Sequence, residues 1–123
     1  IENLIGIEEI KLPYIQKGIT SNYAYFPVLF NDNKISRDEI YHELRKHNIY
    51  SRKYFYPLTN NFQCYQSNHT PNHTPIAQYV SERILTLPLY ADLQLDDVDR
   101  ICDVIKTTLN GIQLPILKGD GLI

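Results

Sequence analysis

The sequence predicts a small α/β (α+β) domain, in which a mostly antiparallel sheet of three to four strands packs with two to four helices. Stretches rich in aromatic and β-branched residues alternate along the chain with stretches whose apolar residues recur at helical spacing. At 123 residues, the chain is long enough for one domain with a hydrophobic core. Its net charge of -2 argues against a nucleic-acid binder, because such proteins usually carry a basic surface.

The composition also limits the setting in which the chain works. No apolar run approaches the roughly 18 residues that a membrane-spanning helix needs, and no secretory signal pattern is present. Cys64 and Cys102 lack metal-site spacing and need not form a disulfide. We therefore expect a cytoplasmic protein without membrane contact. The chain begins at Ile1 and contains no methionine, so we expect it to be part of a longer polypeptide.

The first strand is expected within residues 22–30, after a lead-in over residues 1–21. The lead-in shows poor alternation of its apolar residues before Pro13, which predicts a short helix or an irregular segment. Residues 22–30 read NYAYFPVLF, a composition that favours an extended strand. Pro27 removes one donor from the ladder, so it implies a sheet edge or a bulge at that point.

A helix is expected to start after Ser36. Ser36 and Glu39 form a capping-box pattern, in which each side chain bonds the other residue's backbone amide. Ile40 and Leu44 then recur at the spacing of one buried helical face. Asn48 is expected to end this helix and to lead the chain into the next strand.

Residues 49–57, reading IYSRKYFYP, carry the clearest functional signal as a predicted strand with cations among aromatic rings. Alternation places Tyr50, Arg52, Tyr54 and Tyr56 on one face, and Ile49, Ser51, Lys53 and Phe55 on the other. Arginine offers a planar fork of donors to phosphate or carboxylate, and tyrosine stacks on rings while it donates a hydrogen bond. This face therefore suits an anionic ligand that contains a ring. The alternative is an exposed edge strand with solvated cations.

The second half of the chain predicts a polar loop, a helix, a strand and a final helix. Residues 58–75 are polar and repeat NHTP, while residues 76–83 read as a short helix and residues 84–90 as a strand. The C-terminal tail of the chain, residues 113–123, is expected to be poorly ordered. The final helix begins near Asp96. Its buried face is formed by Val98, Ile101, Cys102, Ile105 and Leu109.

The chain lacks the usual short signatures of catalysis, such as a glycine-rich phosphate loop or a nucleophile elbow. His42 and His47 lie on a predicted helix, where a surface or half-buried histidine is the common case. Lys53 has aromatic neighbours, yet we do not expect it to form a Schiff base. His69 and His73 flank Pro71, which prevents the helix that would bring them together as metal ligands. We expect no catalytic residue and no metal site in this chain.

The order of these segments resembles a known family. NYAYFPVLF, RDEIYHELRKHNIYSRKYFYPL, PIAQYVSERILTLPLY and LDDVDRICDVIKTTL together resemble the C-terminal small domain of the DegT/StrS-type nucleotide-sugar aminotransferases. These are pyridoxal-phosphate enzymes with the aspartate-aminotransferase fold, also called fold-type I. The resemblance implies a lead-in over residues 1–21, a small domain over residues 22–112, a tail over residues 113–123, and a cofactor-binding large domain that this chain does not contain.

The resemblance also implies which residues contact substrate, because the segment after the first helix approaches the sugar nucleotide in relatives. By position, the substrate-binding residues are Arg52, Tyr54, Phe55 and Tyr56, supported by Tyr23, Tyr25 and Asn22. Many relatives carry a histidine after the Pro-Leu that ends this motif, whereas this chain has Thr59. No catalytic or cofactor-binding residue is implied within the chain.

The implied reaction is amino transfer, from glutamate to a nucleotide-linked keto-deoxysugar, for polysaccharide biosynthesis. The implied cofactor is pyridoxal 5'-phosphate, held by the full-length enzyme and not by this part alone, and the full-length enzyme is expected to be a homodimer. The isolated chain is expected to be inactive. The alternative is a non-enzymatic, ferredoxin-like α/β module that binds a ligand or regulates another protein.

Overall fold

A computed structural model describes residues 2–31, 34–65, 74–112, 114–115 and 121–123. In these ranges the helices are α1 (Arg37–Lys46), α2 (Pro75–Ser81) and α3 (Leu95–Leu109), and the strands are β1 (Ile10–Lys11), β2 (Phe26–Phe30) and β3 (Ile84–Leu87). Short 3-10 helices cover Glu2–Leu4, Thr59–Asn61 and Gln63–Tyr65. The strands form one antiparallel sheet in the order β1-β2-β3, which confirms the predicted fold class.

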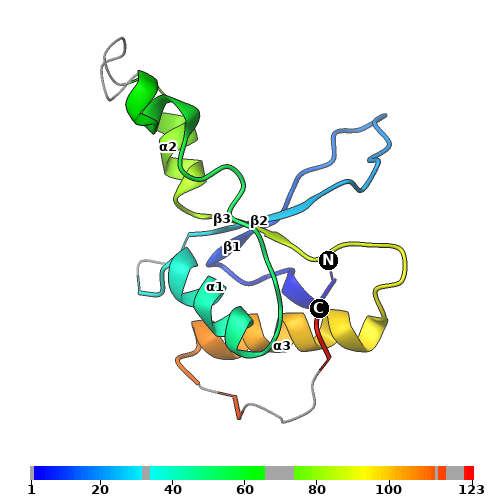
Figure 1. The fold of residues 1–123 in the computed structure, drawn as a ribbon. Helices are drawn as coiled ribbons and strands as arrows, with labels where there is room; N and C mark the ends of the chain where they lie inside the picture. Colours follow the sequence, from blue (N-terminus) through cyan, green and yellow to red (C-terminus); the bar gives the residue numbers. More distant parts are fainter. Residues whose placement is uncertain (1, 32–33, 66–73, 113, 116–120) are drawn as a thin grey trace.

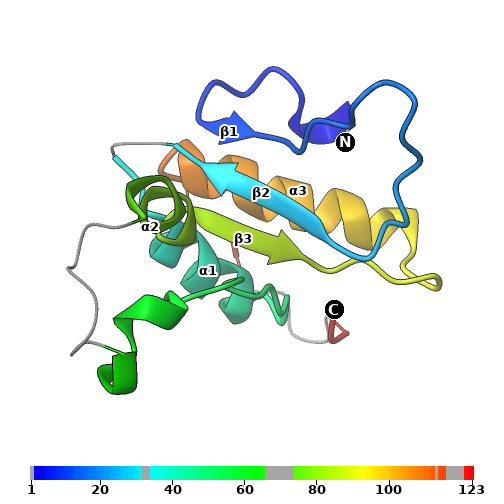
Figure 2. The same ribbon diagram turned by 90° about the horizontal axis from the view of Figure 1, so that it is seen from above.

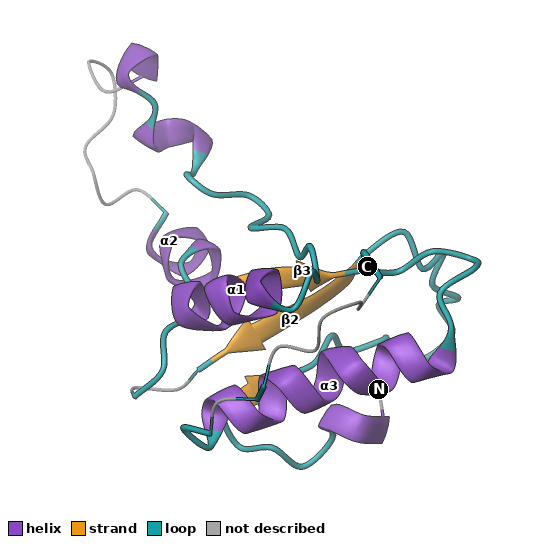
Figure 3. Ribbon diagram, turned by 60° about the horizontal axis from the view of Figure 1, so that its bottom comes forward, coloured by secondary structure: helices purple, strands orange, loops and turns teal. Residues whose placement is uncertain are grey.

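Helices α1 and α3 cover one face of this sheet, as Figure 1 and Figure 3 show. Figure 2, seen from above, shows the three strands side by side over these helices. Helix α2 and the 3-10 helices Thr59–Asn61 and Gln63–Tyr65 project away from this body (Figure 1). The face of the sheet opposite α1 and α3 is here called the outer face. Neither of these two helices covers it. None of the helices in the described ranges has the length and apolar character to cross a membrane.

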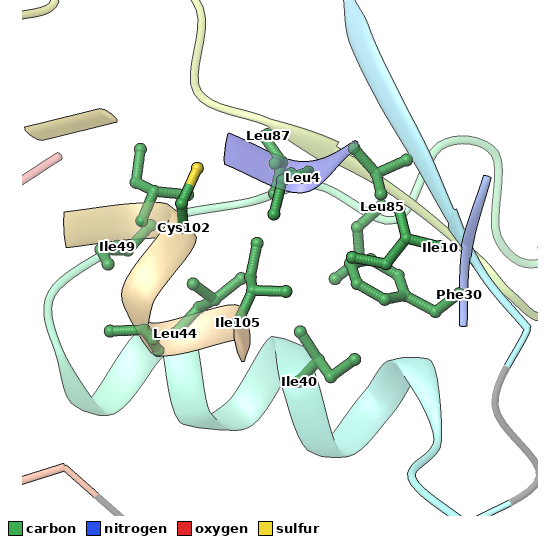
Figure 4. Packing of buried hydrophobic residues seen from close by; sticks show 13 residues of the cluster. Leu4, Ile10, Phe30, Ile40, Leu44, Ile49, Leu85, Leu87, Cys102 and Ile105 are labelled. Carbon is green, nitrogen blue, oxygen red and sulfur yellow. The ribbon is translucent and has the colours of Figure 1, made fainter. Parts of the chain in front are cut away.

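The hydrophobic core lies between the sheet and the two helices (Figure 4). Its side chains come from alternate residues of the strands and from one face of each helix, as the period of 2 in strands and 3.6 in helices requires. Its buried members are Leu4, Ile10, Val28, Phe30, Ile40, Leu44, Ile49, Leu85, Leu87, Ile101, Cys102, Val104 and Ile105. The predicted buried face of α3 is confirmed at Ile101, Cys102 and Ile105, and Val104 is an additional buried residue. Val98 and Leu109 are only partly buried and pack against this core.

The N-terminal segment contributes a strand that the sequence did not predict. β1 pairs Ile10 with Phe30 and Lys11 with Leu29, so part of the expected lead-in belongs to the sheet. Continuing this register would place Pro13 opposite Pro27, and neither residue can donate a ladder hydrogen bond. β1 therefore ends after two residues. Pro27 lies beside β3 but beyond the end of β1, at a local edge as expected.

Helix α1 begins with the predicted capping box. The Ser36 hydroxyl accepts a bond from the Glu39 amide, and the Glu39 carboxylate accepts one from the Ser36 amide. The helix ends at Lys46 with His47 as its C-cap, and Asn48 adopts a left-handed backbone with φ 58°. His42 is exposed, but His47 is buried, so the expectation of a surface or half-buried histidine is wrong at His47.

The strand expected over residues 49–57 is much shorter in the structure. Ile49 and Ser51 are buried and Tyr50 and Arg52 are exposed, so the predicted alternation holds up to Arg52. Arg52 forms an isolated antiparallel bridge with Thr86, with backbone bonds of 2.9 and 2.8 Å. After Arg52 the backbone leaves the sheet in a turn, and Lys53 Nζ lies 2.7 Å from Asp38 Oδ1 of α1. The predicted strand is therefore wrong beyond Arg52.

The remaining elements agree with the predictions within one to three residues at most boundaries. The predicted strand over residues 84–90 is β3, which ends at Leu87 before Pro88. Ile123 donates to the Asn48 carbonyl at 3.0 Å and accepts from the Tyr50 amide at 2.8 Å, so this part of the expected poorly ordered tail is bonded to the domain. The NHTP repeat, with His69 and His73, lies outside the described residues except at its end.

Candidate functional site

The candidate site lies on the outer face of the sheet. Strand alternation turns Leu85 and Leu87 toward the core, so Ile84 and Thr86 point to the outer face. Arg52 is paired with Thr86 and shares its face, since residues directly opposite in a ladder lie on the same side. The sheet therefore presents a guanidinium from its edge.

Arg52 lines a pocket of about 420 Å³, here called the Arg52 pocket. Its walls are largely aromatic and apolar, with one cation. They are formed by Ala24, Tyr25, Tyr50, Arg52, Tyr54, Thr86, Leu87, Pro88, Leu89, Tyr90, Leu122 and Ile123. Arg52 Nη1 donates to the Tyr54 hydroxyl at 3.2 Å. No other side chain of the described ranges bonds this guanidinium, so its remaining donors can reach an anion in the pocket. A ring and a phosphate would both find complementary groups here.

A second pocket of about 370 Å³, here called the α2 pocket, adjoins the first. Its surface is nearly all apolar, and it is formed by Tyr25, Pro27, Tyr54, Phe55, Leu58, Ala77, Val80, Ser81, Ile84 and Thr86. Tyr25, Tyr54 and Thr86 line both pockets. The rings of Tyr25 and Tyr54 meet edge to face with centroids 5.3 Å apart, so this pair forms the wall between the two pockets.

The structure brings together three of the six predicted substrate-binding residues. Arg52, Tyr54 and Tyr25 line the Arg52 pocket, and Phe55 lines the α2 pocket with its side chain exposed. Tyr56 lines neither pocket, because its ring stacks on the guanidinium of Arg37 at 4.9 Å.

Tyr23 lies apart from its predicted neighbours. It lines a separate apolar pocket of about 240 Å³ together with Leu4 and Cys102. Its backbone is left-handed, with φ 51°, so the extended alternation that would place Tyr23 beside Tyr25 is broken at this residue. Asn22 bonds locally, since its Oδ1 accepts from the Ala24 amide at 3.1 Å.

Several residues of the Arg52 pocket were missing from the sequence-based prediction. Tyr50 stands on the same predicted face as Arg52, so alternation was a usable signal for it. Tyr90 is the last residue of the third predicted strand, but no local pattern indicates that it reaches this pocket. Leu122 and Ile123 arrive from the far end of the chain through the backbone bonds between Ile123 and residues 48–50.

An ion-pair network lies under the turn that follows Arg52. Asp38 Oδ1 is 2.5 Å from Arg37 Nε and 2.7 Å from Lys53 Nζ. Partial burial opposes ionisation of Asp38, but the hydrogen bond from Lys53 and the charge of Arg37 outweigh it, so the pKa of Asp38 lies below its ordinary value of 3.8. Asp38 is therefore a carboxylate at neutral pH, and Lys53 is its partner.

The described residues contain no group of three or more potential ligands that would hold a metal ion. Asp96 and Asp97 occupy the first turn of α3, where carboxylates complement the positive end of the helix dipole. Cys64 is exposed and Cys102 is buried, and both are free thiols. Burial raises the pKa of the Cys102 thiol above its ordinary value of 9.0, so this cysteine is a core residue and not a nucleophile.

Residues 1–106 of the chain match the DegT/DnrJ/EryC1/StrS aminotransferase family. Over 88 residues the chain is 43% identical to a dTDP-4-amino-4,6-dideoxy-D-glucose transaminase of Escherichia coli, covering 69% of this chain and 24% of that protein. Over 110 residues it is 30% identical to a UDP-N-acetyl-3-dehydro-alpha-D-glucosamine 3-aminotransferase of Acidithiobacillus ferrooxidans, covering 89% of this chain and 28% of that protein. The chain thus spans about a quarter of the length of these curated relatives.

Solved structures show the same similarity. A DegT/DnrJ/EryC1/StrS aminotransferase of Brucella abortus superposes with a TM-score of 0.72 at 26% identity, covering 87% of this chain and 27% of that one. An aminotransferase of Streptoalloteichus hindustanus shares the fold with a TM-score of 0.76 at 22% identity, covering 89% of this chain and 29% of that one. The family match over most of the chain and the shared fold together lead to one conclusion: the chain belongs to the DegT/DnrJ/EryC1/StrS aminotransferase family.

Proposed function

We propose that this chain is the small C-terminal domain of a pyridoxal-phosphate-dependent aminotransferase that transfers an amino group from glutamate to a nucleotide-linked keto-deoxysugar. The observation that carries the proposal is the Arg52 pocket, which combines a guanidinium with tyrosine rings on the outer face of the sheet. The names of the relatives support a nucleotide-sugar substrate. The family match also favours this function over a ferredoxin-like binding module.

In this proposal the Arg52 pocket binds and orients the sugar nucleotide. Arg52 donates to the diphosphate, and the tyrosine rings contact the sugar or the base. We assign no proton transfer to this chain, because the histidines on α1 line neither the Arg52 pocket nor the α2 pocket.

The described residues do not fit the cofactor. An aminotransferase holds pyridoxal phosphate through a lysine amine, and this cofactor supplies the electron sink for amino transfer. No lysine of the described ranges lines the Arg52 pocket or the α2 pocket, and Lys53 is bonded to Asp38 with its ammonium 4.5 Å from the Tyr41 ring. We therefore place the cofactor in a large domain outside this chain, and we expect the isolated chain to be inactive and the full-length enzyme to be a cytoplasmic homodimer.

The test is the Arg52→Ala variant of the full-length enzyme, compared with wild type by steady-state kinetics on the sugar nucleotide. Loss of a charge-assisted contact with phosphate is expected to raise KM about 10-fold to 100-fold. Arg83→Ala is the matched control, because Arg83 pairs with Glu82 on the surface and lines neither pocket. An unchanged KM in Arg52→Ala would remove Arg52 from the site.

A further inference from the structure

Asp38 joins two cations that come from different parts of the chain. Its Oδ1 lies 2.5 Å from Nε of Arg37, the neighbouring residue on α1, and 2.7 Å from Nζ of Lys53, the residue that follows Arg52. The carboxylate is thus bonded on one side to a helix of the core layer. On the other side it is bonded to the turn that carries Tyr54.

Arg37 holds Asp38 in place, because Arg37 is itself fixed by burial and hydrogen bonds. It is only 3% exposed, and its Nη1 donates to the carbonyls of Ser81 and Ile84, both at 3.0 Å. These carbonyls belong to the end of α2 and the start of β3, so Arg37 ties three elements together. Because a buried guanidinium with satisfied donors has little freedom to move, Asp38 is held beside it.

The turn over residues 53–56 contacts the Arg37 and Asp38 pair at both of its ends. Lys53 is bonded to Asp38 and lies 4.5 Å from the centroid of the Tyr41 ring, and Tyr56 stacks on Arg37 at 4.9 Å. The Tyr56 amide donates to the Lys53 carbonyl at 3.2 Å, which closes the turn. Tyr54 lies between the two attachment points, and its ring is the wall shared by the Arg52 pocket and the α2 pocket.

We propose that Asp38 is a positioning residue for the candidate site, which acts through Lys53 to hold the Tyr54 ring in the wall between the two pockets. The proposal rests on the proposed function. The backbone of Arg52 does not depend on this link, because it is bonded to Thr86. The Arg52 guanidinium donates to the Tyr54 hydroxyl at 3.2 Å, so removal of the Asp38 charge should shift Tyr54, loosen this contact and weaken substrate binding.

The experiment compares Asp38→Asn, Asp38→Glu and Lys53→Met in the full-length enzyme, with Arg52→Ala alongside. KM for the sugar nucleotide, kcat, and Kd for dTDP as a non-reacting probe are measured for each variant. We expect Asp38→Asn and Lys53→Met each to raise KM and Kd about threefold to tenfold. We expect kcat to change less than about twofold, because only binding is weakened. Asp38→Glu keeps the charge and should recover most of the affinity.

The matched control is Lys46→Met, which breaks another ion pair of α1, Lys46 with Glu43 at 2.7 Å, away from both pockets. Lys53→Met also covers the case in which Asp38→Asn fails to fold, since it leaves the contact between Asp38 and Arg37 intact. If Asp38→Asn and Lys53→Met keep the wild-type KM while Arg52→Ala raises it, the positioning role is overturned and the proposed function stands. If Arg52→Ala also keeps the wild-type KM, the positioning role is overturned and the Arg52 pocket is not the site that binds the sugar nucleotide. If Lys46→Met raises KM equally, the effect is not specific and the positioning role is overturned.

Discussion

The two faces of one sheet differ in how their side chains are used. On the inner face, Leu85 and Leu87 pack into a core with α1 and α3. On the outer face, Ile84 and Thr86 lie beside pockets whose aromatic walls stay open to solvent at Tyr25, exposed at 60%. The same strands therefore supply stability through one set of alternate residues and a binding surface through the other. Changes on the two faces should have separable effects.

The largest expected effect on stability comes from the inner face. Ile105 is fully buried, so Ile105→Ala should lower the free energy of unfolding by about 2 to 5 kcal/mol through lost burial and a residual cavity. Phe55→Ala on the outer side removes a ring that is 74% exposed and should change it by less than about 0.5 kcal/mol. Urea denaturation of both variants provides the comparison. Equal destabilisation by the two changes would show that the outer aromatic residues also hold the fold.

The buried cation Arg37 tests whether polar contacts, as well as the apolar core, stabilise the fold. Arg37→Met should lower the free energy of unfolding by about 2 kcal/mol, because the Ser81 and Ile84 carbonyls lose their donor and Asp38 loses a partner. Arg45→Met, which changes an exposed arginine of the same helix, should cost less than about 0.5 kcal/mol. The measurement is again urea denaturation. A neutral Arg37→Met would mean that apolar packing replaces the network.

The smallest effect concerns the charge of Asp38. The pKa of Asp38 is lower in the folded chain than its ordinary value of 3.8, so the ionised form stabilises the fold above that pH. This contribution is lost as the pH falls through the lowered pKa. At neutral pH we expect Asp38→Asn to cost about 0.5 kcal/mol, because the carboxylate is half exposed.

Denaturation of wild type and Asp38→Asn between neutral and strongly acidic pH measures this difference. The two stabilities should converge only below pH 3.8, since protonated Asp38 no longer attracts Arg37 and Lys53. A gap that stays constant or widens on acidification would contradict the assigned ion pairs.

Local patterns in the sequence predicted the two helices that pack on the inner face of the sheet, α1 and α3. The Ser36 and Glu39 capping box placed the start of α1, and the spacing of Ile101 and Ile105 placed the buried face of α3. Such signals act within a few residues, so they are readable in the chain itself. The short β1 strand was missed, because it forms only when Lys11 meets Leu29 across the sheet.

The candidate site was predicted in part for the same reason. Alternation along residues 50–54 grouped Tyr50, Arg52 and Tyr54, and these three residues line one pocket. It failed at Tyr56, where contact with Arg37 replaces the extended backbone, and at Tyr23, where a left-handed residue interrupts it. Their substrate-binding roles stay predictions until the Arg52 variant is measured.

Local patterns in the sequence were sufficient for α1, α2, β3 and α3 and for most of the buried face of α3, because such signals act within a few residues. The family was indicated by the resemblance of several segments in order. The turn of residues 53–56 away from the sheet and the burial of Arg37 became visible in the folded structure alone. Both outcomes depend on contacts between residues more than a dozen positions apart, such as Asp38 with Lys53 and Arg37 with the Ser81 carbonyl. Such contacts form only where folding brings distant residues together, so no local pattern in the sequence reveals them.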